Sequence, residues 1–372
     1  MKTAIISVTE KGAHLGQQVK SLIAPTADCY EKEGKGSRQE AIYFSSMKDI
    51  IGDLFKDYDR LLCIMATGIV VRMIAPYIVH KSKDPAIVVM DELGKHVISL
   101  LSGHLGGANE WTTAIGMAVK ADPVITTATD VNGLFAPDVF ARQQDLQVDD
   151  FKSLIAVNAA IIGGKSVTYY VDKDLVRSDT YVQTLQTFLG CISVIEMIDV
   201  LSMTVTIDGA IAKHRYTTVL DDEPAVLITD KLVHTEPNVL VLRPKTYTIG
   251  IGCRRNTPKE YILEAIHESL GVYQLSPKSI KTAASVNVKA DEVGLLAAMK
   301  ELEWPIEFYD PQEMSEFIEQ AQLEESNFVK ETIGVGNVCE TTALLAAKSN
   351  KLIQPKTIFK KTTVAIALVT SK

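Results

Sequence analysis

Apolar runs of strand length alternate with helical segments through the first third of the chain. The runs of strand length are residues 2–8, 60–66, 86–90 and 96–101. After the first run, residues 12–23 place apolar side chains at helical spacing. A short acidic, glycine-bearing turn joins the last two runs, which predicts a β-hairpin. We therefore predict a three-layer-like α/β domain over residues 1–131, with helices packed on a sheet.

The rest of the chain has a weakly patterned middle and a clearly patterned C-terminal part. Residues 132–231 mix short apolar runs with one or two helical patterns, and we predict a small middle α/β module there. Residues 232–245 have the composition of a linker. Residues 246–372 open with a strand that ends in Gly-Ile-Gly-Cys-Arg-Arg, and they predict a C-terminal α/β domain. The expected class is thus a multi-domain α/β protein.

Composition and charge narrow the functions that this chain can have. Hydrophobic residues make up 47% and charged residues 23% of the sequence, as in a globular protein. The net charge of −8 and the lack of a basic run argue against a nucleic-acid partner. The five cysteines show no CxxC spacing, which favours a reducing compartment. Without a leader pattern or an apolar window of about 18 residues, we expect a cytoplasmic protein with no membrane partner.

The glycine-rich segment between the run 96–101 and the next helical pattern carries the strongest chemical signal. Its candidate residues are Gly103, His104, Gly106, Gly107, Asn109 and Glu110. Glycines let the backbone approach a ligand, and a helix start presents unpaired N–H donors. His104 would be an acid or base beside them, with Asn109 or Glu110 as a polar partner. The alternative is a tight turn in which Asn109 caps the helix. Neither a Walker loop nor a GxGxxG fingerprint is present, which disfavours nucleotide binding.

Two further candidates precede this segment. Thr67 and Gly68 follow an apolar strand and Arg72 comes one helical turn later, so backbone N–H groups and a guanidinium could bind a carboxylate. The alternative places Arg72 on a solvated helix face. Asp91 closes the next strand, where its carboxylate would act as a base or would initiate the hairpin turn.

An arginine pair follows the strand that opens the C-terminal domain. Arg254 and Arg255 form an anion-binding loop and would lower the pKa of Cys253. Because no histidine is nearby in sequence, we interpret the arginines as binders and Cys253 as structural. Lys289 could join them or be solvated, and Glu340 is a site carboxylate or a favourable charge in the first turn of a helix. No HExxH, GxSxG or aspartate-rich metal loop is present, so we predict no protein-bound metal.

Five segments carry a resemblance to a known family. They are ATGIVVRMIAP (66–76), DPAIVVMDELGKHVISLLSGHLGGANE (84–110), PVITTATD (123–130), GIGCRRNT (250–257) and VCETTALL (338–345). Together and in this order they resemble the cobalt-precorrin-5A hydrolase family of anaerobic cobalamin biosynthesis. The sequence departs from the family pattern at Asn256, where we expect glycine. Asparagine tolerates the left-handed backbone region, so we expect the loop to keep its shape.

The resemblance implies a reaction on a cobalt-bound, ring-contracted tetrapyrrole. Water opens the δ-lactone of cobalt-precorrin-5A, and the two-carbon fragment leaves as acetaldehyde to give cobalt-precorrin-5B. No resident cofactor is implied, because the substrate carries its own cobalt. The macrocycle bears many carboxylates, which would explain arginines gathered at Arg72, Arg254 and Arg255 in an acidic protein.

Within this hypothesis the glycine-rich segment supplies the chemistry. His104 is the general acid or base, and Asp91 orients or assists it. Asn109, Glu110 and the backbone of residues 103–107 would line the side of the developing oxyanion.

The expected partner is a small-molecule corrinoid, while a homodimer and transient contacts with neighbouring pathway enzymes stay open. Two rival functions stay open as well. A non-catalytic tetrapyrrole carrier would bind the macrocycle without changing it. A sugar-phosphate or nucleotide enzyme would be protected from thermal unfolding by phosphates.

Overall fold

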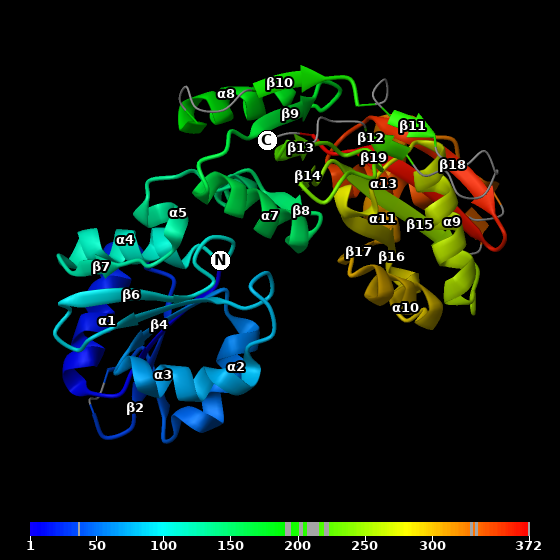
Figure 1. Cartoon of the computed structure of the whole chain (residues 1–372). Helices are drawn as coiled ribbons and strands as arrows, with labels where there is room; N and C mark the ends of the chain where they lie inside the picture. The colour runs from blue at the N-terminus through cyan, green and yellow to red at the C-terminus, as the bar shows by residue number, and fades with distance from the viewer. Residues whose placement is uncertain are drawn as a thin grey trace. The chain divides into compact units, whose positions relative to one another are not determined.

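The computed structural model describes residues 1–35, 38–189, 195–200, 204–206, 216–218, 223–327, 330–331 and 334–370. The chain divides into two compact units, unit 1 (Met1–Gln143) and unit 2 (Gln144–Lys372) (Figure 1). Among the described residues, no helix has the length and apolar surface that crossing a membrane requires.

Unit 1 is built on a seven-stranded sheet with the order β3-β2-β1-β4-β5-β6-β7. Its strands are β1 (Thr3–Ser7), β2 (Asp28–Lys32), β3 (Ala41–Phe44), β4 (Arg60–Ile64), β5 (Ala86–Met90), β6 (His96–Leu101) and β7 (Asp122–Val124). Strands β1 to β5 pair in parallel, whereas β6 runs antiparallel to β5, and β7 runs parallel to β6. The connection between β5 and β6 is too short for a parallel crossover. The predicted hairpin is confirmed.

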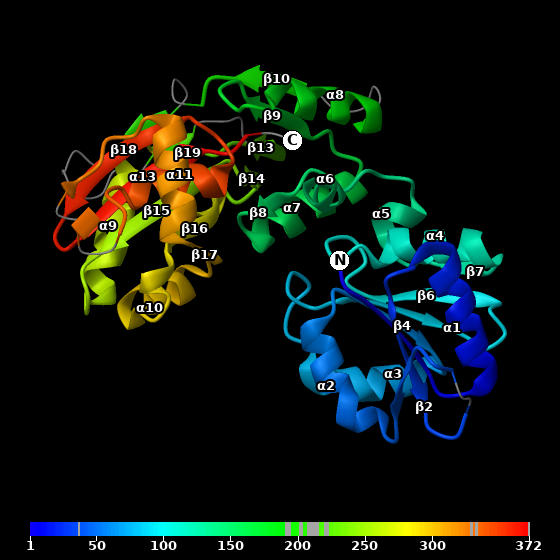
Figure 2. The ribbon, with the colours of Figure 1, turned by 180° about the vertical axis from the view of Figure 1, so that it is seen from behind.

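Helices cover both faces of this sheet (Figure 2). They are α1 (Glu10–Ile23), α2 (Met47–Asp57), α3 (Thr67–Ile74), the 3₁₀ turn η1 (Ala75–Tyr77), α4 (Ala108–Val119), α5 (Ala128–Val131) and α6 (Pro137–Gln143). Helices α1 and α4 pack on one face around Val19, Trp111 and Ile115, and α2 and α3 pack on the other around Ile51 and Val70. Successive strand residues point to opposite faces and so enter different cores. The predicted three-layer α/β architecture is confirmed.

Unit 1 continues beyond the boundary predicted at residue 131. The apolar pattern weakens there, but α6 buries Phe140 and Ala141, and the compact unit extends to Gln143. Residues after 131 therefore share a unit with the glycine-rich segment.

The first part of unit 2 is a five-stranded sheet with the order β10-β9-β13-β14-β8 and a separate two-stranded pair, β11-β12. Its elements are β8 (Leu146–Val148), α7 (Phe151–Ile162), β9 (Thr168–Asp172), α8 (Ser178–Leu189), β10 (Ile195–Ile198), β11 (Thr204–Thr206), β12 (Tyr216–Thr218), β13 (Ala225–Ile228) and β14 (Val239–Pro244). The segment 232–245, predicted as a linker, contains β14, which pairs with β13 and β8. All six residues of β14 are buried. Its continuous apolar run is typical of a strand covered on both faces.

The second part of unit 2 is a five-stranded sheet with the order β17-β16-β15-β19-β18. Its elements are β15 (Tyr247–Cys253), α9 (Lys259–Val272), η2 (Pro277–Ser279), β16 (Ile280–Val286), η3 (Asn287–Lys289), α10 (Val293–Leu302), β17 (Ile306–Tyr309), α11 (Pro311–Ala321), α13 (Cys339–Ala347), β18 (Leu352–Phe359) and β19 (Thr362–Leu368). Strands β15, β16 and β17 are parallel, and β19 closes antiparallel on β15. Helix α13 lies very close to β15, since a Cβ at Gly250 would come within 1.8 Å of the Cys339 carbonyl oxygen.

Candidate active site

The glycine-rich segment is a tight turn that folds back on itself before α4. Gly107 is the N-cap of α4 and has a φ of 80°, a conformation that favours glycine. A Cβ at Gly106 would come within 2.5 Å of the Ser102 Cβ. The Gly107 N–H donates to the His104 carbonyl at 2.9 Å, and the Ala108 N–H donates to the Ser102 carbonyl at 3.2 Å. These two donors are therefore used within the turn and are not aimed at a ligand.

Asn109 is buried, but its side chain does not cap the helix. Its Oδ1 accepts from Ser99 Oγ at 2.6 Å. Its Nδ2 donates to Thr127 Oγ1 at 2.9 Å and to Asp130 Oδ2 at 3.0 Å. Gly103 lies directly against this amide, where a Cβ would come within 2.7 Å of Oδ1. Asn109 thus fixes the segment 127–130 to the glycine-rich turn.

His104 is held between two carboxylates. Its Nδ1 lies 3.1 Å from Asp138 Oδ1, and its Nε2 lies 2.6 Å from Asp130 Oδ2. The side chains of His104 and Asp138 are 10% and 6% exposed, and that of Asp130 is 34% exposed. Both ring nitrogens can donate to a carboxylate only when the imidazole is protonated. Burial alone lowers the pKa of His104, but the hydrogen bonds and charges of Asp138 and Asp130 together raise it.

His104 and Asp130 line a pocket of about 140 Å³, together with Glu110 and Arg142. Glu110 is exposed and forms an ion pair with Arg142. The pocket therefore presents the edge of the His104 ring and the Asp130 carboxylate, whereas the Arg142 guanidinium is already paired with Glu110. Asp138 and Arg142 were not predicted as site residues, because both follow the predicted domain boundary. Asp130 ends the family-like segment PVITTATD, but no role was predicted for it.

Asp91 lies far from His104 and initiates the hairpin turn. Its carboxylate accepts from the backbone N–H groups of Leu93, Lys95 and His96 at 2.9, 3.0 and 2.7 Å. Strand β6 then runs the whole depth of the sheet, about 20 Å, before the glycine-rich turn begins. The expectation that Asp91 orients or assists His104 is wrong, because the antiparallel β6 carries His104 to the opposite sheet edge. The orienting carboxylate is Asp138.

Thr67, Gly68 and Arg72 follow β4, which is parallel to β5, so they lie at the same sheet edge as Asp91. Arg72 is exposed, and its Nη1 donates to the Gly68 carbonyl at 2.9 Å. The arginine thus folds back on its own helix. The structure does not bring these three residues together with His104.

The arginine pair at the end of β15 is divided between two roles. Arg254 lines a pocket of about 270 Å³ with Cys253, Lys289 and Lys356. Arg255 forms ion pairs with acidic side chains at 291 and 292, so it is not available for an anion. Asn256 has a φ of 56°, as predicted for a loop in which it replaces glycine.

The Arg254 pocket opens where the parallel strands β15 and β16 end, the usual ligand site of open α/β sheets. Lys289 is 7% exposed and lines this pocket. Burial raises the pKa of Cys253 to about 11, although Lys289 and Arg255 oppose this effect. Arg255 does lower this pKa, as expected, but the expected net lowering is wrong, because desolvation of the thiolate outweighs the arginine charge. Cys253 is therefore a neutral thiol near pH 7.

Glu340 stabilises local structure. Its Oε2 accepts from Asn337 Nδ2, and its Oε1 accepts from the Lys356 backbone N–H at 2.8 Å. Among the described residues, no group of three or more histidine, cysteine, aspartate or glutamate side chains is arranged to hold a metal ion.

Three family models match consecutive parts of the chain. The model described as Cobalamin synthesis G N-terminal matches residues 49–130. Cobalamin biosynthesis central region matches residues 135–244, and Cobalamin synthesis G C-terminus matches residues 247–367. The class is that of three-part α/β proteins of cobalamin biosynthesis.

Similar proteins of known name identify the family within this class. The cobalt-precorrin-5A hydrolase of Priestia megaterium is 31% identical over 98% of this chain and 94% of its own length. That of Salmonella typhimurium is 30% identical over 94% of this chain and 93% of its own. A solved structure of a cobalamin biosynthesis protein G homolog from Sulfolobus solfataricus is 22% identical, covering 99% of this chain and 97% of that one, with a TM-score of 0.35. The chain belongs to the cobalt-precorrin-5A hydrolase family, as its motifs predicted.

Proposed function

We propose that this protein hydrolyses the δ-lactone of cobalt-precorrin-5A and releases acetaldehyde, giving cobalt-precorrin-5B. The observation that carries the proposal is the similarity to cobalt-precorrin-5A hydrolases over nearly the whole chain. Cobalt enters as part of the substrate, and the proposal includes no resident cofactor. We place the reaction in the cytoplasm, with a small-molecule corrinoid as partner and without nucleic acid.

The chemistry would begin at the carboxylate–imidazolium pair of unit 1. Asp130 accepts a proton from water as the water oxygen bonds to the lactone carbonyl carbon. The ring carbon–oxygen bond then breaks, and the departing oxygen takes the Nε2 proton of His104. Asp138 holds Nδ1 and keeps the ring aligned during both proton transfers. This assignment replaces the expected partner Asp91 with two carboxylates that contact the ring.

The second stage would use the same two groups in reverse. Neutral His104 takes the proton of the new hydroxyl group, and the carbon–carbon bond breaks as the acetaldehyde carbonyl forms. The electron pair passes into the conjugated macrocycle, which takes up the proton that Asp130 accepted. Water and lactone are thus converted to a carboxylic acid and acetaldehyde, with both side chains returned to their starting states.

The Arg254 pocket of unit 2 would bind peripheral carboxylates of the substrate. Lys289 supports this role because a buried ammonium with access to a pocket favours an anionic partner. Arg255 is left out of the proposed site because its guanidinium is bonded to two acids.

The decisive experiment is an anaerobic incubation with cobalt-precorrin-5A, in which acetaldehyde is trapped and the macrocycle is weighed by mass spectrometry. We expect acetaldehyde together with the matching loss of the two-carbon unit. Tight binding with an unchanged macrocycle mass would overturn the hydrolase and favour a carrier. With His104→Gln, we expect folded protein, retained substrate binding and at least a hundredfold slower release of acetaldehyde. Near-normal release from this variant would exclude the proposed role of His104.

A further inference from the structure

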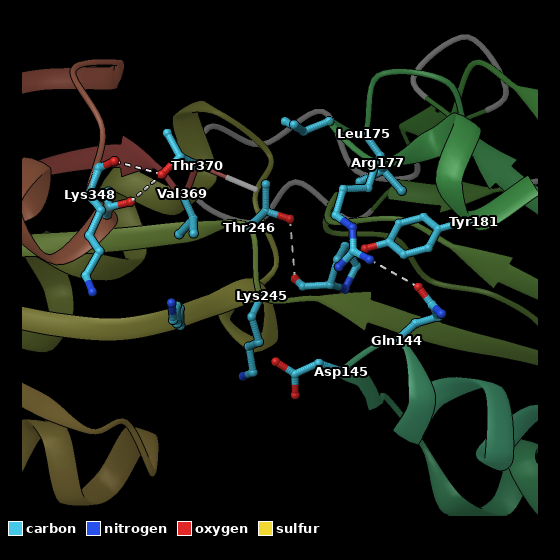
Figure 3. Close-up of a pocket in the computed structure, with 14 residues that line it drawn as sticks. Gln144, Asp145, Leu175, Arg177, Tyr181, Lys245, Thr246, Lys348, Val369 and Thr370 are labelled. Carbon is cyan, nitrogen blue, oxygen red and sulfur yellow. Dashed lines mark hydrogen bonds between the residues drawn. The ribbon is translucent and has the colours of Figure 1, made fainter. Parts of the chain in front are cut away.

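A second basic pocket lies in unit 2, at the opposite end of β15 from the Arg254 pocket. Its volume is about 500 Å³, and it is lined by four cationic side chains, Arg177, Lys245, Lys281 and Lys348, and by the carboxylate of Asp145. Figure 3 shows Arg177 on one side of this pocket and Lys348 on the other. Because β15 has seven residues, the two pockets are about 20 Å apart along the strand. They are therefore separate sites.

Lys245 is fixed in place without being neutralised. Its Nζ donates to Gln147 Oε1 at 2.6 Å and to the carbonyl oxygens of Lys278 and Ile280 at 2.8 and 3.2 Å. All three acceptors are uncharged. Burial lowers the pKa of Lys245, with Asp145 opposing this effect. An anion placed in the pocket would stabilise the charged form of this side chain.

Arg177 is held in a similar way. Its Nη2 donates to Gln144 Oε1 at 3.2 Å, and its guanidinium lies 5.3 Å from the ring centre of Tyr181. Figure 3 shows Arg177 beside Tyr181 at the side of the pocket. An amide and an aromatic ring orient the guanidinium and leave its charge for another partner.

The two remaining cations, Lys281 and Lys348, are exposed. Lys281 lies between Ile280 and Thr282, where the pairing of β15 with β16 shifts register, so it has no paired residue on β15. Lys348 ends α13 with a φ of 51°. Across the described part of the chain, none of the four cations forms an ion pair.

The pocket also has an apolar wall, which limits the kind of anion that it suits. Leu175 is buried and Val176 is 52% exposed, and Pro244, Ala347 and Val369 complete this wall. A small inorganic anion would leave these side chains in water. A ligand with several carboxylates on a large apolar frame would cover them and also meet the cations.

We propose that this pocket is a second binding site for a polycarboxylate with an apolar frame. Substrate and product of the proposed reaction both belong to this class, so the identity of the frame rests on the proposed function. Four cations without an ion pair among the described residues attract anions whatever the frame, even in a protein of net charge −8. The site would hold a macrocycle by its edge, away from the Arg254 pocket.

Lysine protection tests the site directly in the unmodified protein. Acetic anhydride labels exposed amines, and mass spectrometry of peptides gives the rate for each lysine. The probe is cobyrinic acid, a stable corrin with carboxylates around its periphery. We expect at least threefold slower labelling of Lys281 and Lys348 at saturating probe. Lys300, an exposed lysine in the last turn of α10, should keep its rate. Unchanged labelling of Lys281 and Lys348 would overturn the proposal.

Substitution provides the second arm. In the double variant Lys281→Gln with Lys348→Gln we expect the Kd for cobyrinic acid at this site to rise about tenfold, and Lys300→Gln should leave it unchanged. Glutamine already occupies left-handed positions at Gln274 and Gln322, so the change at 348 is compatible with folding. Cobyric acid, in which most of these carboxylates are amides, should protect neither lysine. Equal protection by both corrins would exclude carboxylate recognition.

The two proposals can fail separately. Labelling needs no turnover, so protection without acetaldehyde release would retain this site and reject the hydrolase. Acetaldehyde release without protection would retain the hydrolase and reject this site.

Discussion

The substitution Asp138→Asn tests whether the protein holds His104 as an imidazolium. It keeps the size of the side chain and replaces the carboxylate that lies 3.1 Å from Nδ1 with a neutral amide. Asp138 and Asp130 both act to raise the pKa of His104 against the opposing effect of burial. Removal of one of these charges therefore lowers this pKa.

The expected loss of stability follows from burial and from pH. Breaking a buried ion pair costs about 3–5 kcal/mol, but the amide oxygen can still accept a hydrogen bond from Nδ1, so we expect about 2 kcal/mol at pH 6. The folded-state pKa of His104 is raised above its unfolded value, which is about 6.5. The contribution of His104 to the free energy of unfolding is therefore fully present below about pH 6.5. It is lost as the pH rises through the folded-state pKa of His104. The difference between wild type and variant must shrink from pH 6 to pH 9.

Tryptophan fluorescence can follow this effect in unit 1 alone. The chain has two tryptophans, Trp111 in unit 1 and Trp304 in unit 2. Urea unfolding in a Trp304→Phe background therefore reports on the core around Trp111. Asp122→Asn, at an exposed position of β7, is the matched control and should change stability by less than about 0.5 kcal/mol. An equal loss for Asp138→Asn at pH 6 and pH 9 would refute the imidazolium.

Three other tests, made up of four substitutions and one modification, address separate parts of the structure. Gly106→Ala should destabilise unit 1 by about 1–3 kcal/mol in urea unfolding, because its Cβ would come within 2.5 Å of a neighbouring Cβ. Gly271→Ala, where no heavy atom lies within 4 Å of the added Cβ, should change stability by less than about 1 kcal/mol. Alkylation of Cys253 by iodoacetamide should accelerate with pH up to about 11, and a plateau near pH 8 would contradict the raised pKa. Arg254→Gln should raise the KM for the corrinoid about tenfold, whereas Arg255→Gln should raise it less than twofold; equal effects would reject the division between them.

The sheet of unit 1 is predictable because its signals are local. The runs 86–90 and 96–101 are apolar and are joined by a turn that Asp91 initiates, so neighbouring residues determine the hairpin. The secondary structure of the middle of the chain is harder to predict. The apolar run of β14 is surrounded by polar and proline-containing segments. Only its pairing with β13 and β8 shows that it is a strand and not part of a linker.

The site could be predicted only in part, because its contacts join residues that are distant in sequence. His104 contacts Asp130 and Asp138, which are 26 and 34 positions away. No periodic pattern indicates such a contact. Asp91 is nearer in sequence but lies across the sheet, since an antiparallel strand separates residues that a hairpin turn had brought together. Arg255 was a reasonable candidate for anion binding, but its guanidinium forms ion pairs with two acidic side chains that follow η3.

The cations of this protein fall into two groups. Those in ion pairs stabilise the fold, whereas those without an ion pair are candidates for binding an anionic ligand. Arg142, Arg243 and Arg255 each bond to carboxylates of this chain. Within the residues that the structure describes, the cations of the two unit 2 pockets form no ion pair, so they repel one another when no anion is present. Such clusters do not stabilise the fold. Binding of a polycarboxylate ligand would relieve the repulsion between their cations. Binding of cobyrinic acid must therefore weaken steeply between 50 mM and 500 mM salt, because salt screens these charges. Equal affinity at both salt concentrations in calorimetric titration would contradict this role of the cations.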